Sequence, residues 1–134
     1  MLVLTSALFT VPAFLGIFFQ KPLFGTLYGS LAIVSTSYHF TKNRNWLYLD
    51  YPLCYCITLL LAHEAFQQRL MPVFILGGVS VFILFWGGWL SGRMVFSPNK
   101  FEKLVSHSLM HLIVNFSACA LLLYQKSPNL KPPL

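Results

Sequence analysis

Five long apolar runs, separated by short polar breaks, make up most of this sequence. Each run is close to the roughly 17–25 residues that an α-helix needs to cross a membrane. Lipid offers the backbone no hydrogen-bond partners, and the alternating pattern of a membrane barrel is missing, so helices are expected. The expected spans are about Leu2–Phe19, Leu23–Phe40, Trp46–Phe66, Met71–Leu90 and Leu104–Tyr124. The sequence therefore predicts an all-α, polytopic transmembrane bundle of about five spans.

Composition supports this class of protein. Of the 134 residues, 57% are hydrophobic and only 9% are charged, whereas soluble chains carry roughly a quarter charged residues. A soluble enzyme, a disordered tail and a disulfide-stapled scaffold are thereby excluded. We expect one helical domain over residues 1–124 and an extended C-terminal tail over residues 125–134, which holds three prolines.

The charged residues are mostly basic, with nine Lys and Arg against three Asp and Glu and a net charge of +6. These cations stand at the ends of the apolar runs, as membrane-edge anchors do, and do not form the stripe that binds phosphates. We therefore expect membrane lipids as partners and no nucleic acid. With five spans, five cations lie on the N-terminal face and four on the other, so the positive-inside rule does not decide the orientation.

The first run resembles a secretory signal in length only. It has no basic segment before it, and Phe18-Phe19-Gln20-Lys21 offers no small-residue cleavage site. We treat it as a retained span, with a removed or re-entrant segment as the alternative.

Among the polar side chains inside the apolar runs, five stand out, because ionisable groups there indicate function by default. Ser35 and His39 come at the end of the second run, Asp50 early in the third, and His107 and His111 early in the fifth. Because alternate spans run in opposite directions, all five residues are expected at similar depth in one leaflet. This predicts a shared site.

The spacing of the histidines favours a metal. His107 and His111 are four residues apart and share one helix face, and His39 comes from another helix. Three imidazoles leave a fourth position of Zn²⁺ open for water, as in catalytic zinc sites. Zinc lowers the pKa of bound water to about 7. Asp50 would then take a proton or orient a ligand, and Ser35 would stabilise an oxyanion.

Simpler interpretations exist for each of these residues. His39 is close enough to a polar break to be interfacial, and Asp50 precedes Pro52 as a helix cap often does. Ser35 alone fits a serine bonded to its own helix backbone. Histidines that ligate haem or chlorophyll are a further alternative, less favoured because Asp50 suits zinc better.

The order of these motifs resembles the CREST superfamily of membrane hydrolases, and most closely its alkaline ceramidases. The shared pattern is Ser-x-x-x-His at Ser35 and His39, an Asp early in the next span at Asp50, and His-x-x-x-His at His107 and His111. The resemblance covers roughly two-fifths of the chain. It implies a zinc ion held by the three histidines, with Ser35 and Asp50 flanking the water that attacks a ceramide amide.

Two departures from the family stand out. The family has seven spans and five are counted here, so the chain resembles a truncated core with part of its lipid chamber missing. The ceramidases also carry an acidic N-terminal calcium site, whereas no Asp or Glu precedes Asp50 here.

Two functions follow as hypotheses. The first is a zinc-dependent hydrolase of a lipid amide or ester, which the resemblance would place in the endoplasmic reticulum or Golgi. The second is a non-catalytic subunit of a larger complex in an organellar membrane, which retains the metal site and whose C-terminal tail contacts other subunits. The small volume enclosed by five short helices favours the second, and neither the substrate nor the membrane follows from the sequence.

Overall fold

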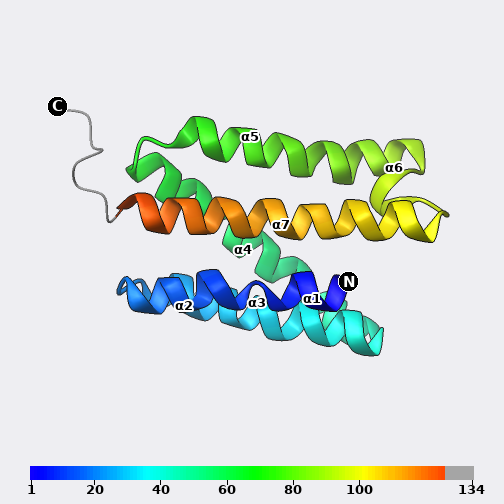
Figure 1. The fold of residues 1–134 in the computed structure, drawn as a ribbon, viewed down its shortest axis with the longest axis horizontal. Coiled ribbons are helices and arrows are strands. Elements are labelled where there is room, and N and C mark those ends of the chain that lie inside the picture. Colours follow the sequence, from blue (N-terminus) through cyan, green and yellow to red (C-terminus); the bar gives the residue numbers. More distant parts are fainter. Residues whose placement is uncertain (126–134) are drawn as a thin grey trace.

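The structure is a computed structural model that describes residues 1–125, and its regular elements in that range are all helices (Figure 1). An all-α fold is thus confirmed. Residues 126–134, which form nearly all of the expected tail, lie outside the described residues. The elements are α1 (Leu2–Ala7), α2 (Thr10–Phe18), α3 (Pro22–Thr41), α4 (Arg44–Gln67), α5 (Met71–Phe82), the π-helical turn η1 (Ile83–Gly87), α6 (Gly88–Ser91), the 3-10 turn η2 (Met94–Phe96) and α7 (Lys100–Gln125).

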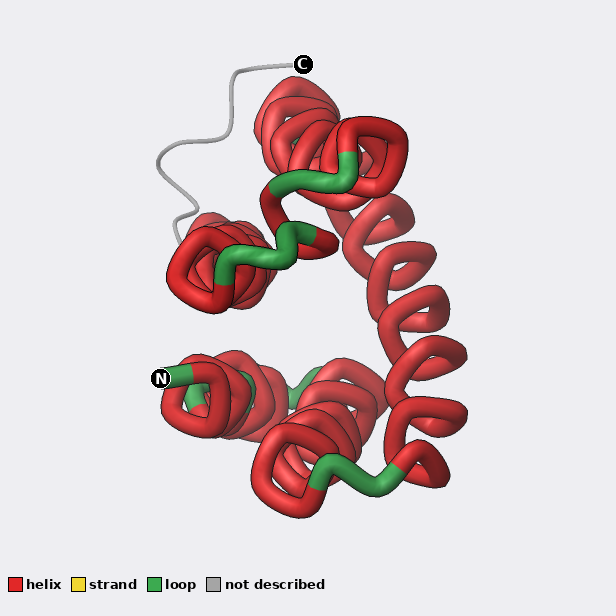
Figure 2. The backbone as a smooth tube through the Cα atoms, turned by 90° about the vertical axis from the view of Figure 1, so that its right-hand side faces the viewer, coloured by secondary structure: helices red, strands yellow, loops and turns green. Residues whose placement is uncertain are grey.

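The helices form two groups that α4 connects. Figure 2 looks along most of the helices, with α1, α2 and α3 in one group, α5, α6 and α7 in the other, and α4 strongly inclined between them. α7 also contacts α1 and α2, which joins the two groups directly. The N-terminus, the end of α3 and the start of α7 lie at one end of the molecule, and the turns α2–α3 and α4–α5 lie at the other (Figure 1).

At the end of the molecule that holds the N-terminus, individual residues determine where the helices begin and end. Lys42 adopts the left-handed conformation, with φ of 59°, and terminates α3. Asn43 is the N-cap of α4, because its Oδ1 accepts a hydrogen bond of 2.9 Å from the backbone N–H of Asn45. Asn99 precedes α7 in the same way and accepts from the N–H of Phe101 at 2.9 Å. These local contacts fix where α3 ends and where α4 and α7 begin.

The first expected span is interrupted, in contrast to the continuous helix predicted over Leu2–Phe19. α1 and α2 are separated by a turn at Leu8 and Phe9. Pro12 explains the break, because it has no N–H to donate to the carbonyl of Leu8 and its ring would clash with that carbonyl in a regular helix. α1 is therefore a short segment that a single turn separates from α2.

The hydrophobic core lies between α2, α3, α4 and α7. Phe24 and Tyr28 stack at a centroid distance of 4.9 Å, and Phe9 lies 6.2 Å from the Tyr28 ring. Aliphatic side chains complete this cluster, namely Leu31, Ile57, Leu61, Leu121 and Leu122. The polar residues predicted to form a site lie beyond this cluster, toward the N-terminal end of α7.

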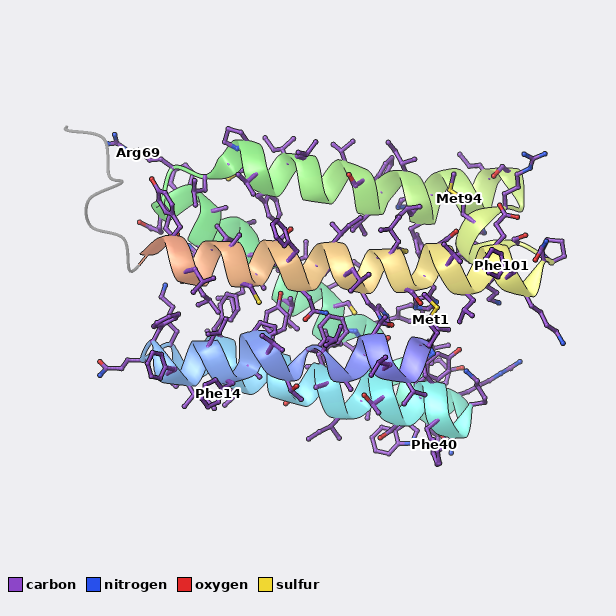
Figure 3. All side chains as sticks on the ribbon, viewed as in Figure 1. Met1, Phe14, Phe40, Arg69, Met94 and Phe101 are labelled. Carbon is purple, nitrogen blue, oxygen red and sulfur yellow. The ribbon has the colours of Figure 1, made fainter. Side chains whose placement is uncertain are left out.

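Two helical stretches among the described residues are long and apolar enough to cross a membrane, Met71–Ser91 and Lys100–Tyr124. Leu2–Phe18 is apolar but shorter. Many large apolar side chains are exposed, and Phe14, Phe40 and Phe101 lie on the outer surface of the bundle (Figure 3). Within α5, no residue is buried. Water-soluble proteins rarely expose apolar surface on this scale.

Candidate metal centre

Three histidines from two helices meet at one point. His39 lies in the last turn of α3, and His107 and His111 lie in the first half of α7. One ring nitrogen from each can be chosen so that all three lie within 4.8 Å of one another. The ring centroids are 4.9 Å apart for His39 and His107, 5.5 Å for His39 and His111, and 4.8 Å for His107 and His111. The predicted convergence of these three residues is confirmed.

Helix geometry explains why they meet. His107 and His111 are one turn apart on α7, so their side chains project from the same face. α3 ends shortly after His39, where Lys42 turns the chain away. The N-terminal half of α7 lies near this end of α3, which places a third imidazole opposite the pair.

The ring nitrogens of His39 are suited to bind a metal. This side chain is 5% exposed, and within residues 1–125 neither Nδ1 nor Nε2 has a hydrogen-bond partner. Buried polar atoms without partners are costly, and each one in a native structure calls for an explanation such as a bound ion. A cation bound by His39 would satisfy one of these nitrogens.

The dimensions of the cluster also fit a metal. Two nitrogens on a tetrahedral zinc lie about 3.4 Å apart, because zinc–nitrogen bonds are roughly 2.0–2.1 Å long. The nitrogens here lie within 4.8 Å, so shifts of about 1 Å in the side chains bring them to that separation. Neutral imidazoles are common ligands for several transition metals. The three histidines can therefore hold a metal ion, and the donor set alone leaves its identity open.

His111 is held by two hydroxyl groups of α1. Its Nδ1 lies 3.2 Å from Thr5 Oγ1 and 3.3 Å from Ser6 Oγ, and both contacts are buried. The Phe9 ring packs against the same imidazole, with centroids 5.2 Å apart. These contacts occupy Nδ1 and leave Nε2 as the nitrogen available to a metal.

Ser35 is connected to the histidine cluster through Ser6. It is 1% exposed, and its Oγ lies 3.2 Å from Ser6 Oγ. The alternative, a serine bonded only to its own helix backbone, does not account for this contact with Ser6. Through Ser6, the Ser35 hydroxyl is connected to the ring of His111.

Asp50 is linked to the histidine cluster through Ser35. It is in the second turn of α4, and Asn43 caps that helix, so the alternative of Asp50 as a helix cap is wrong. The Ser35 side chain interacts with its carboxyl group, and Oδ1 is buried without a hydrogen-bond partner among the residues that the structure describes. Asp50 is not among the three residues whose ligand atoms meet. The carboxylate thus borders the site through Ser35.

Sequence reasoning missed Thr5 and Ser6. Both are buried, and they form the polar contacts of His111. A signal for them existed, because they are adjacent hydroxyl residues at the start of the first apolar run, on the same face of the membrane as the other five. Applying the argument from depth to all polar residues, and not only to ionisable ones and Ser35, would have included them.

Comparison of the chain with protein-family models, with curated proteins and with solved structures finds no match. The assignment of the metal centre therefore rests on its own residues.

Proposed function

We propose that this chain is an integral membrane zinc protein that hydrolyses a lipid amide or ester, as the alkaline ceramidases that it resembles do. The observation that carries the proposal is the meeting of three imidazoles beside a serine and an aspartate inside an apolar helical bundle. His39, His107 and His111 would hold the zinc. A zinc ion held there would polarise the substrate carbonyl and make water a nucleophile near neutral pH.

Asp50 and Ser35 have distinct roles in this proposal. The free Oδ1 of Asp50 accepts a proton from the attacking water and returns it to the leaving nitrogen or oxygen. The Ser35 hydroxyl donates a hydrogen bond to the carbonyl oxygen as negative charge develops there. In the amide case the C–N bond breaks, the water oxygen joins the acyl carbon, and a fatty acid and an amine result.

The surroundings of the site suit a lipid substrate. The exposed apolar side chains of the helices match acyl chains, and two helical stretches are long enough to span the bilayer. We infer that α3, α4 and the α1–α2 segment complete about five spans. The cluster lies near one end of the bundle, where an amide close to the head-group region of a lipid would reach it.

A non-catalytic subunit of a larger membrane complex is the second candidate. The observation behind it is that no residue of α5 is buried, so the outer side of this helix is available to a neighbouring chain as well as to lipid. In this case the metal would stabilise the fold without supporting turnover.

The metal content of the purified protein tests both candidates. We expect about one zinc per chain in the wild type, and none in His107→Ala, because removing one of three ligands leaves too few to hold the ion. His63→Ala is the matched control, since His63 is exposed near the far end of α4. Zinc would be quantified by mass spectrometry, and hydrolysis of a fluorescent ceramide would be measured on the same samples.

The outcomes separate the candidates. Zinc with ceramide hydrolysis supports the enzyme, and zinc without hydrolysis of any lipid amide or ester supports the subunit. Equal zinc in the wild type and in His107→Ala would defeat the assignment of the ligands.

A further inference from the structure

The contacts of α1 with His111 go beyond what packing requires. Thr5 and Ser6 are adjacent on a helix of six residues, and both hydroxyl oxygens approach the same ring nitrogen, more than 100 positions away in the chain. Ser6 is fully buried. The contact therefore joins the start of the chain to a candidate metal ligand near its end.

The hydrogen-bond direction at Thr5 can be deduced. Its Oγ1 donates to the backbone carbonyl of Leu2 at 3.1 Å. A hydroxyl has a single hydrogen, so Thr5 can only accept in its second contact, with His111 Nδ1. The imidazole must then carry its proton on Nδ1. In a neutral imidazole, this leaves the lone pair on Nε2, where a metal needs it.

Ser6 continues the network away from the ring. With Nδ1–H as the donor, Ser6 Oγ also accepts from His111, and its own proton is free to bond Ser35 Oγ at 3.2 Å. The proton of Ser35 then remains available to Asp50, with which it interacts, or to a developing oxyanion. One set of directions thus satisfies every contact from His111 to Asp50.

We propose that Thr5 and Ser6 are positioning residues that fix the Nδ1–H tautomer of His111 and aim its Nε2 at the metal. This inference rests on the proposed metal site. It adds α1 to that site as the element whose side chains hold a metal ligand in place. Metal-bound histidines usually donate their second nitrogen to such a partner, and losing that partner typically costs about 10–100-fold in metal affinity. Here neutral hydroxyls take the place that a carboxylate or carbonyl occupies in many sites.

A second threonine has the same bond to its own helix backbone without the contact to an imidazole. Thr10 Oγ1 donates to the carbonyl of Ala7 at 2.8 Å, three residues back, as Thr5 does to Leu2. Thr10 is exposed, and among the described residues its hydroxyl contacts no imidazole. It therefore serves as a matched control for the removal of a threonine hydroxyl.

The test compares zinc affinity, measured by competition with a chelator, among variants of the full chain. Thr5→Val keeps the shape of the side chain and removes the acceptor, and Ser6→Ala removes the other. We expect a loss of a few-fold for each single variant and about 10–100-fold for the double variant. Thr10→Val should match the wild type, and Thr5→Ser should restore the affinity that Thr5→Val loses.

A second measurement does not depend on the metal. In metal-free protein labelled with ¹⁵N histidine, the shifts of His111 should report a proton on Nδ1 in the wild type, and a mixture of tautomers in the double variant. Thermal melting would identify any variant that fails to fold, and Thr5→Ser supplies a second route in that case.

The two proposals fail in different ways. A wild type that binds no zinc would overturn the proposed function, while the tautomer of His111 would still decide the role of α1. A wild type that binds zinc with the same affinity as the double variant, or a wild-type His111 protonated on Nε2, would overturn the present inference alone.

Discussion

In the proposed mechanism, Asp50 moves protons without binding the metal. Its carboxyl group lies beside Ser35, outside the group of three histidines whose nitrogens meet. A charged residue at this depth would be expensive unless it had a function or a partner. Its Oδ1 is buried without a hydrogen-bond partner in the described part of the chain, which suits the proton acceptor of the proposed mechanism.

Asp50→Asn should therefore separate chemistry from metal binding. We expect the variant to keep its zinc and to lose turnover of ceramide by about 10²–10⁴-fold, because an amide cannot accept the proton. Glu64→Gln is the matched control on the same helix, since Glu64 pairs with Lys21 away from the histidines. Loss of zinc in Asp50→Asn would instead make the carboxylate part of the metal-binding set, and unchanged turnover would remove it from the mechanism.

The residues of the centre differ in how far sequence could predict them. The spacing of His107 and His111 on one helix is visible directly, and His39 follows from its depth. Thr5 and Ser6 could not be assigned with the same ease, because hydroxyl residues are common in apolar helices and bond their own backbone. Only the packing of α1 against α7 reveals their contact with His111.

At the level of elements, α2 and α3 approach each other unusually closely at two glycines. A Cβ built on Gly16 would lie 2.7 Å from the backbone nitrogen of Gly25, and one built on Gly25 would lie 3.1 Å from the carbonyl oxygen of Ala13. Small residues at helix interfaces allow such approaches in membranes. This contact sets the position of the α1–α2 segment against α3.

Gly16→Ala should therefore destabilise the fold. The added methyl group meets backbone atoms, which cannot rotate away, so we expect a loss of about 1–3 kcal/mol in the free energy of unfolding. Gly78→Ala on α5 is the control, because a Cβ added there meets no neighbouring side chain or helix within 4 Å and alanine favours helix. Thermal melting in detergent measures both, and equal melting temperatures for the two variants would contradict the close packing of α2 and α3.

The helices themselves were largely predictable, and their internal irregularities were not. Four of the five apolar runs correspond to helical stretches with nearly the expected ends, because hydropathy and short polar breaks mark them. The exception is the first run, where Pro12 separates α1 from α2. A proline inside an apolar run signals a kink or a break, and the neighbouring contacts decide which of the two forms.

For the molecule as a whole, the arrangement of the connections predicts a definite topology. The N-terminus, the α3–α4 connection and the start of α7 lie at one end, and the α2–α3 and α4–α5 turns lie at the other (Figure 1). If the bundle spans a membrane about five times, these ends face opposite compartments. Sequence alone could not orient the molecule, because the basic residues are divided almost equally between the two faces.

Labelling of single cysteines tests this topology. In a background with Cys54, Cys56 and Cys119 replaced by alanine, we expect Arg44→Cys and Lys100→Cys to react with a membrane-impermeant thiol reagent from one side. Gln20→Cys and Gln67→Cys should react from the other side only. All four of these side chains are exposed in the structure, so burial within the protein does not limit their reaction.

The strongest part of this test is the pair on α4, because that helix is inclined to the others (Figure 2). Arg44 and Gln67 are its first and last residues, 23 positions apart, and a rise of about 1.5 Å per residue separates them by roughly 34 Å. That length crosses a hydrocarbon core of about 30 Å only if the tilt from the membrane normal is moderate. Labelling of both positions from the same side would place α4 along the membrane surface, and the metal centre would then lie at an interface between lipid and water.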